Sequence, residues 1–148
     1  MFLLEYNEAT DTFSDPDTAK PYTGPAYSLF DDGKTETQGF IKDGKLDGEW
    51  VEYWPNGKPS SRGTYTASIE NGSWQYWWEN GQIEAQGALT ADVPTGEWQE
   101  WSEDGLLLSK GSYVSGQQEG EWMITDPKSG KHQTVVYKNG KPKPLKKK

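Results

Sequence analysis

Glycine and tryptophan recur at a fixed spacing of 24 residues along most of this 148-residue chain. The segments that begin at Gly48, Gly72 and Gly96 align without a gap, and further glycines and aromatic residues fall into the same register. Self-similarity at such a period is typical of repeat proteins, in which one supersecondary unit stacks on the next. The recurring tryptophans are Trp50, Trp74, Trp98 and Trp122.

Each copy predicts a β-hairpin. A run of about seven residues leads to Asn-Gly or Asp-Gly, and a second run follows it. These dipeptides supply the positive φ angles of a type I′ turn, so residues 56–57 are expected to form a two-residue turn. That register pairs Trp54 with Pro59 and Trp50 with Gly63. We therefore predict an all-β fold, a single-layer elongated antiparallel sheet of about five tandem 24-residue β-hairpins.

The pattern divides the chain into three segments. Residues 1–20 are expected to form an N-terminal edge strand, from Phe2 to Tyr6, and an acidic cap; residues 21–141 form the hairpin array; residues 142–148 form a flexible basic tail. The first and last copies are degenerate, with Ala26 at the tryptophan position and TDPKSG in place of the tight turn. Terminal repeats usually diverge in this way because they face solvent on one side.

The expected register assigns residues to the two faces of the sheet. Paired residues share a face and alternate residues switch faces, so the recurring tryptophans lie together with each large ring opposite a glycine. Aromatic residues at a structural period normally pack, and we expect this face to be the core. Its predicted core residues are Trp50, Trp74, Trp98, Trp122, Tyr65, Leu89 and Tyr113.

A third aromatic column occupies the opposite face. Tyr53, Trp77 and Trp101 recur there among polar residues, beside Arg62 and Lys110. An aromatic stripe with polar neighbours is typical of a binding surface, and we interpret these five residues as candidates for partner binding. The alternative is that loops or the N-terminal segment cover the rings.

Two stretches resemble a known repeat. GEWVEYWPNGK at residues 48–58 and PYTGPAYSLFDDGK at residues 21–34 resemble the MORN repeat in its bacterial variant form, which recurs in YwqK-like antitoxins. The resemblance covers about residues 20–141 and implies a stack of antiparallel hairpins that holds a protein, or in some eukaryotic MORN proteins a membrane or lipid. Polar second strands such as PSSRG depart from the Tyr-Gly-rich eukaryotic form, so lipid binding is not expected to carry over.

Composition restricts the chemistry. The chain has no cysteine and one histidine, His132, so thiol catalysis and cysteine-based metal sites are excluded. Carboxylates are numerous but repeat with the fold, which indicates solvated positions rather than one acid-base pair. We expect no enzyme activity, no metal and no cofactor; a glycan hydrolase that uses aromatic stacking and paired acids is the catalytic alternative.

Charge is distributed unevenly along a chain of net charge -8. Seven acids and one base precede residue 33, whereas eight lysines and no acid follow residue 127. The acidic body disfavours specific or nonspecific nucleic-acid binding and favours a basic partner. The lysine tail is interpreted as solubilising; the alternative is a tether to nucleic acid or anionic lipid headgroups, and hence membrane contact.

Together these patterns favour a protein-binding module, most concretely an antitoxin or immunity protein that covers the surface of a basic toxin from a neighbouring gene. With no recognisable signal peptide or membrane span, we expect a cytoplasmic protein. The alternative is a scaffold repeat protein that organises an assembly, at a membrane through its lysine tail. The oligomeric state is left open.

Overall fold

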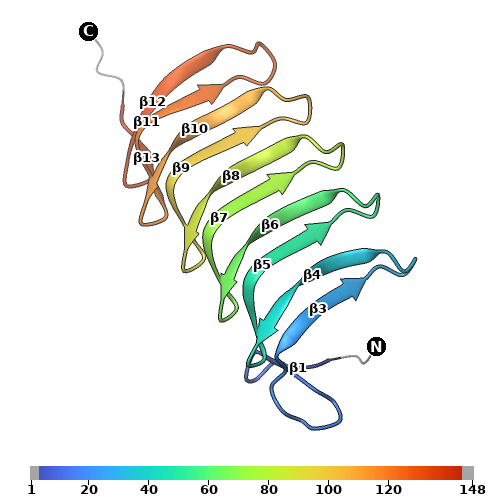
Figure 1. Ribbon diagram of the computed structural model, residues 1–148. Coiled ribbons are helices and arrows are strands. Elements are labelled where there is room, and N and C mark those ends of the chain that lie inside the picture. Colours follow the sequence, from blue (N-terminus) through green and yellow to red (C-terminus); the bar gives the residue numbers. More distant parts are fainter. Residues whose placement is uncertain (1–3, 145–148) are drawn as a thin grey trace.

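One long antiparallel sheet dominates the computed structural model, which describes residues 4–144 (Figure 1). Its eleven strands follow chain order, each paired with the next, and a separate two-stranded sheet precedes them. The predicted all-β, single-layer array of tandem hairpins is confirmed. The strands are β1 (Glu5–Asn7), β2 (Thr12–Ser14), β3 (Gly24–Leu29), β4 (Thr35–Lys42), β5 (Lys45–Tyr53), β6 (Pro59–Thr66), β7 (Ile69–Trp77), β8 (Ile83–Thr90), β9 (Val93–Trp101), β10 (Leu107–Val114), β11 (Gln117–Thr125), β12 (His132–Lys138) and β13 (Lys141–Pro142).

The loops within the hairpins differ from the expected type I′ turns. The Gly57 N–H donates to the Trp54 carbonyl at 2.8 Å, and the Trp54 N–H donates to the Lys58 carbonyl at 2.8 Å. Gly57 has a φ of 85°, whereas Asn56 is absent from the residues with positive φ. These features define a type I turn over Pro55 and Asn56 followed by a glycine bulge.

This bulge shifts the pairing at the end of the hairpin. Tyr53 pairs with Pro59, so the predicted pairing of Trp54 with Pro59 is wrong, while Trp50 and Gly63 pair as predicted. The physical reason is the turn: Pro55 fixes the φ of the first central residue of a type I turn, and one further residue is needed to match the twist of the strands.

True two-residue turns connect successive hairpins on the other side of the sheet. Thr66 pairs with Ile69 across Ala67 and Ser68, which have φ angles of 50° and 66°. Positive φ at both central residues is the type I′ conformation. The equivalent turns lie at residues 43–44, 91–92, 115–116 and 139–140.

Hydrogen bonds join neighbouring hairpins at both sides of the sheet. On the type I′ side, the Ser68 N–H donates to the Leu46 carbonyl at 2.8 Å. On the loop side, Trp54 Nε1 donates to the Trp77 carbonyl at 3.0 Å, and Trp78 repeats this contact one hairpin later with the Trp101 carbonyl. Successive hairpins are therefore joined at both ends of their strands, in addition to the backbone hydrogen bonds between paired strands.

Glycine makes room for the recurring tryptophans. A Cβ added at Gly39 would overlap the Trp50 ring, and Gly63 has the same relation to Trp74. Each indole thus covers the glycine of the preceding hairpin, not the glycine opposite it in its own hairpin. The pairing register of β4 with β5 shifts at Gly39, because residues 48–50 form a bulge opposite it. Such bulges bend strands, and the hairpins in Figure 1 are bent.

These tryptophan rings and intervening tyrosine rings form one continuous ladder along one face of the sheet. We call this face the core face. Neighbouring ring centroids are 5.1–6.5 Å apart from Trp50 to Tyr137. The seven predicted core residues all lie on the core face; Trp98, Tyr65 and Tyr113 are half-buried, and the other four are buried. The ladder also includes Tyr76 and Tyr137, which were not among the predicted core residues. In order it comprises Trp50, Tyr65, Trp74, Tyr76, Trp98, Tyr113, Trp122 and Tyr137.

The two ends differ from the repeat. The expected edge strand is wrong for β1, which pairs with β2 in a hairpin of its own, since its short strands are closed by an acidic turn. The Phe13 N–H of that hairpin donates to the Gly44 carbonyl at 2.7 Å, against the first type I′ turn. Phe2 lies outside the described residues, as does the part of the predicted flexible tail from residue 145 onward; Pro142 belongs to β13.

Candidate functional site

The five residues predicted to bind a partner lie on the face opposite the ladder, which we call the outer face. Tyr53, Trp77 and Trp101 end strands β5, β7 and β9 and are half-buried. Tyr53 Oη accepts a hydrogen bond from Gln38 Nε2 at 2.8 Å. Arg62 is exposed. Lys110 forms an ion pair with Glu97, in which Lys110 Nζ lies 3.4 Å from Glu97 Oε1.

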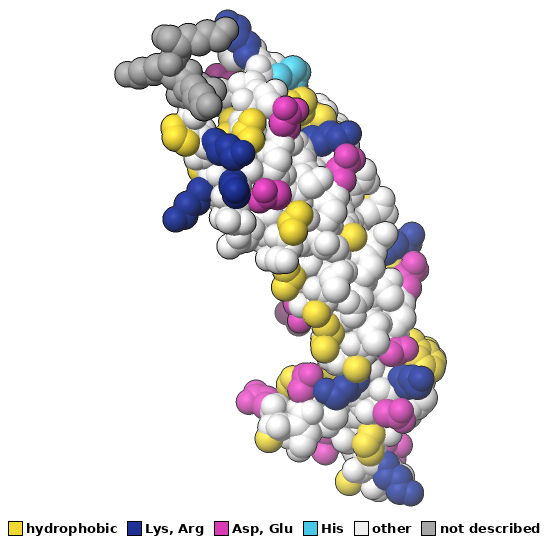
Figure 2. All heavy atoms as spheres, turned by 90° about the vertical axis from the view of Figure 1, so that its left-hand side faces the viewer, with side chains coloured by type: hydrophobic (Ala, Val, Ile, Leu, Met, Phe, Trp, Pro, Cys, Tyr) yellow, Lys and Arg dark blue, Asp and Glu magenta, His cyan; other side chains and the backbone are white. Residues whose placement is uncertain are grey.

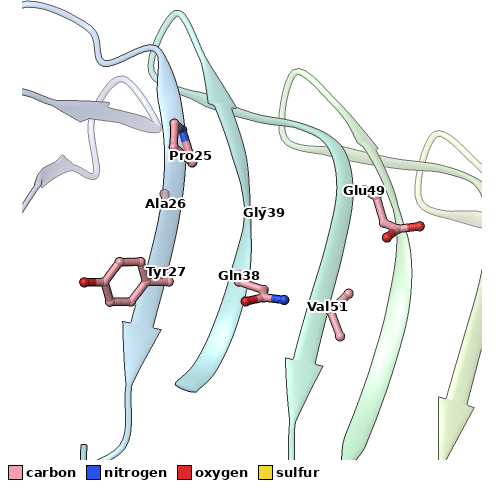
Figure 3. A pocket seen from close by; sticks show the side chains of 7 residues that line it. All are labelled: Pro25, Ala26, Tyr27, Gln38, Gly39, Glu49 and Val51. Atoms are coloured by element: carbon pink, nitrogen blue, oxygen red, sulfur yellow. The ribbon is translucent and has the colours of Figure 1, made fainter. Parts of the chain in front are cut away.

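A shallow depression of about 330 Å³ hollows the outer face over β3, β4 and β5 (Figure 3). Gln38 and Val51 are among the residues that line it, and Glu49 is the one carboxylate among them. Val51 is only 5% exposed, so little apolar surface is offered there. The remaining lining residues are Pro25, Ala26, Tyr27 and Gly39.

Exposed aliphatic residues follow the side that carries the type I′ turns. Ile69, Val93 and Val114 are 42%, 41% and 57% exposed. Figure 2 shows hydrophobic side chains in a row down this side of the molecule, flanked by charged ones. The sequence interpretation did not single them out, although each flanks a type I′ turn; scattered exposed apolar residues of this size are common on monomers.

The larger cavity lies on the core face, where the sequence interpretation expected only packing. This groove of about 800 Å³ occupies the N-terminal end of the array, between the β1–β2 hairpin and β7. Ala26 stands at the repeat position of Trp50, and Ser28 at that of Glu52, so small side chains leave space where the ladder ends. The groove is lined chiefly by Leu4, Phe13, Tyr22, Thr37, Ile41, Leu46, Trp50, Glu52, Ser61, Tyr65 and Trp74, together with residues 25–29 of β3.

Carboxylates make this end of the core face acidic. Burial raises the pKa of Glu70, and the nearby charges of Asp92 and Glu52 raise it further. Burial, followed by the charges of Glu70 and Glu52, raises the pKa of Tyr76 to about 12 and also raises the pKa of Tyr65. Within residues 4–144, none of the three ion pairs uses Glu52 or Glu70.

Metal-binding side chains, the histidine and membrane-spanning helices are the remaining features to consider in the part of the chain that the structure describes. No group of three or more metal-binding side chains comes together there. His132 Nδ1 lies 2.8 Å from Thr125 Oγ1 on an exposed loop end. Over the same residues, no helix could cross a lipid bilayer.

Comparison with known families agrees with this architecture. The model described as the MORN repeat variant matches residues 46–67, 70–87 and 94–115. Those segments coincide with the hairpins β5–β6, β7–β8 and β9–β10. Three of the hairpins are therefore similar to the MORN repeat variant. The first hairpin, with Ala26 at the tryptophan position, and the last, with the sequence TDPKSG in its loop, lie outside the matched segments. No curated protein matches the chain.

Proposed function

We propose that this MORN repeat chain binds another protein through its exposed sheet faces. Repeats of this kind form binding or scaffold modules. The observation that carries the proposal is the outer aromatic column of Tyr53, Trp77 and Trp101, which is separate from the ladder of the core face. The sheet beneath this column is held by hydrogen bonds between neighbouring hairpins at both ends of their strands. Aromatic rings on a rigid support are effective binding anchors because little side-chain entropy is lost.

The more specific proposal is an antitoxin or immunity protein that neutralises a basic toxin in the cytoplasm by covering its surface, without catalysis. Its support is the net charge of -8 and the resemblance of the repeats to those of YwqK-like antitoxins. An acidic surface accelerates encounter with a basic partner, and the acceleration weakens as salt rises.

Co-expression tests both levels of the proposal. Proteins encoded by neighbouring genes are expressed alone and together with this chain, and we expect one of them to be toxic alone and rescued by it. A double Trp77→Ser, Trp101→Ser variant should fold and lose rescue, whereas Gln75→Ser with Gln99→Ser, two residues earlier on the same face, should keep it. Unfolding of the tryptophan variant would reject the outer column as a binding surface, and the absence of a toxic neighbour would reject the antitoxin role.

A scaffold is the second candidate function. It is favoured by β3, which ends the sheet without a neighbour on its outer side among the eleven strands. Unprotected edge strands can pair with further chains. Sedimentation of the full chain distinguishes the two: a monomer that forms one tight complex supports the binding module, and filaments or lipid-dependent dimers support the scaffold.

A further inference from the structure

The ladder of the core face has an open end. Throughout the array, a tryptophan is packed between tyrosine rings of its neighbours, as Trp74 is between Tyr65 and Tyr76 at 5.3 and 6.0 Å. Among the described residues, Trp50 has such a neighbour only on one side, Tyr65, because Ile41 stands at the repeat position of Tyr65 on the other side. The first hairpin also has Ala26 in place of a ring in the tryptophan column. The groove occupies that place.

The groove is apolar in its walls and negative at its side. Trp50, Tyr65, Trp74 and Ile41 supply rings and aliphatic surface, and the exposed carboxylate of Glu52 lines the same space. Among residues 4–144, no lysine or arginine is part of the lining. A ligand that fits must therefore combine an aliphatic stem with a positive head.

Glu70 strengthens this negative side. Burial raises the pKa of Glu70, and the charges of Asp92 and then of Glu52 raise it further. A cation near these carboxylates would be attracted by their negative charge and by the faces of nearby aromatic rings.

Resting on the proposed binding function, we propose that this groove receives a lysine or arginine side chain presented by a protein partner. The long methylene stem of such a residue covers apolar wall while its charged head meets the carboxylate. The choice of occupant rests on charge complementarity: the acidic, base-free groove of a chain with net charge -8 fits a basic segment. The outer column and the groove would then be separate contacts on opposite faces.

Nuclear magnetic resonance of the full chain tests the groove directly. The probe is a five-residue peptide, acetyl-Gly-Gly-Lys-Gly-Gly-amide, and its matched control carries acetyl-lysine, which has the stem without the charge. We expect the lysine peptide to shift the indole signals of Trp50 and Trp74 and the ring signals of Tyr65, and the control peptide to leave them in place.

Two glutamine variants locate the charge. Glu52→Gln should weaken binding of the lysine peptide about fivefold, the size expected for losing a half-exposed ion pair. Glu100→Gln, at the same repeat position two hairpins away and outside the lining, should bind as the parent chain does. Thermal unfolding of both variants checks that each remains folded.

Several outcomes would overturn the proposal. Equal shifts from the two peptides would make the groove a neutral apolar site, and unmoved groove signals at millimolar peptide would leave it without a cationic ligand. Shifts of the Trp77 and Trp101 signals would place cation binding on the outer face and would reject the groove as the site. This result would leave the proposed protein-binding function intact, whereas failed rescue in the co-expression experiment would count against that function. Shifts of Trp50 and Trp74 that grow with protein concentration, and vanish when Lys146, Lys147 and Lys148 are removed, would identify a second copy as the occupant.

Discussion

The six-membered ring of Trp74 lies over Gly63, so closely that a Cβ at residue 63 would overlap its Cδ2 and Cε2 atoms. Gly63 does not have a positive φ, and close approach is therefore the reason for glycine. Gly63→Ala must displace the indole from its site in the ladder. We expect a loss on the order of 3 kcal/mol in the free energy of unfolding, measured with urea.

A control separates this steric effect from backbone strain. Gly57 has a φ of 85° and open space around the position of an added Cβ. Gly57→Ala should therefore cost only the strain of a left-handed alanine, about 1 kcal/mol. Similar losses for the two variants would show that the indole can move aside freely.

The type I′ turn at Ala67 offers a stabilising substitution. Ala67 has a φ of 50°, and its methyl side chain makes no hydrogen bond that glycine would lose. Glycine adopts this conformation without the steric cost, so Ala67→Gly should raise the free energy of unfolding by about 0.5–1 kcal/mol. The same exchange at Ala85, inside β8 and without positive φ, should lower it by a similar amount. A loss of stability in both variants would contradict the turn assignment.

The contrast between the two turns explains what the sequence could and could not predict. The 24-residue period specifies hairpins, faces and the tryptophan-glycine pairing, because each depends on residue type at a regular spacing. Turn type was assigned wrongly at Asn56, since Asn-Gly also fits a type I turn with a glycine bulge. The type I′ turn at Ala67 and Ser68 has no such dipeptide and is held by bonds between hairpins, such as that from the Ser68 N–H to the Leu46 carbonyl. The type I′ turns at residues 43–44 and 139–140 are Asp-Gly and Asn-Gly, so the dipeptide alone does not distinguish the two kinds of turn.

The groove could not be predicted from the sequence for a related reason. Ala26 was visible as a missing tryptophan and was interpreted as the divergence of a terminal repeat. Whether a missing ring leaves a cavity depends on what else packs there. In the described part of the N-terminal segment, Leu4 and Phe13 line the groove. No periodicity in residues 1–20 specifies where the β1–β2 hairpin lies.

The raised pKa of Glu70 predicts a pH dependence of stability. A carboxyl group with a higher pKa in the folded state binds its proton more tightly there than in the unfolded chain. Its contribution to stability is therefore present at low pH and is lost as pH rises above the ordinary glutamate value of 4.5 and through the folded pKa. Glu70→Gln should gain stability relative to the parent chain over that interval, measured by urea unfolding at a series of pH values.

Asp92→Asn provides the matched variant. Asp92 Oδ1 accepts a hydrogen bond from the Glu70 N–H at 2.7 Å, and an asparagine oxygen can keep that bond while the charge is removed. Because burial is the first cause of the shift and Asp92 the second, the titration of Glu70 should move toward its ordinary value without reaching it. A Glu70 carbon-13 titration that is the same in both chains would exclude coupling to Asp92.

The indole N–H groups of the ladder are not equivalent, although their rings repeat. Trp98 Nε1 donates to the Ala88 carbonyl at 3.0 Å, and Trp50 and Trp122 make the corresponding bonds. Trp74 Nε1 is buried without a partner. Replacing the N–H by sulfur, with benzothienylalanine, preserves the ring shape and removes the donor. We expect a loss of about 1 kcal/mol at residue 98 and none at residue 74, where an unsatisfied donor disappears. Equal losses in urea unfolding would mean that Trp74 finds an acceptor in solution, and the Thr64 carbonyl, one residue after Gly63, is the group in the corresponding position.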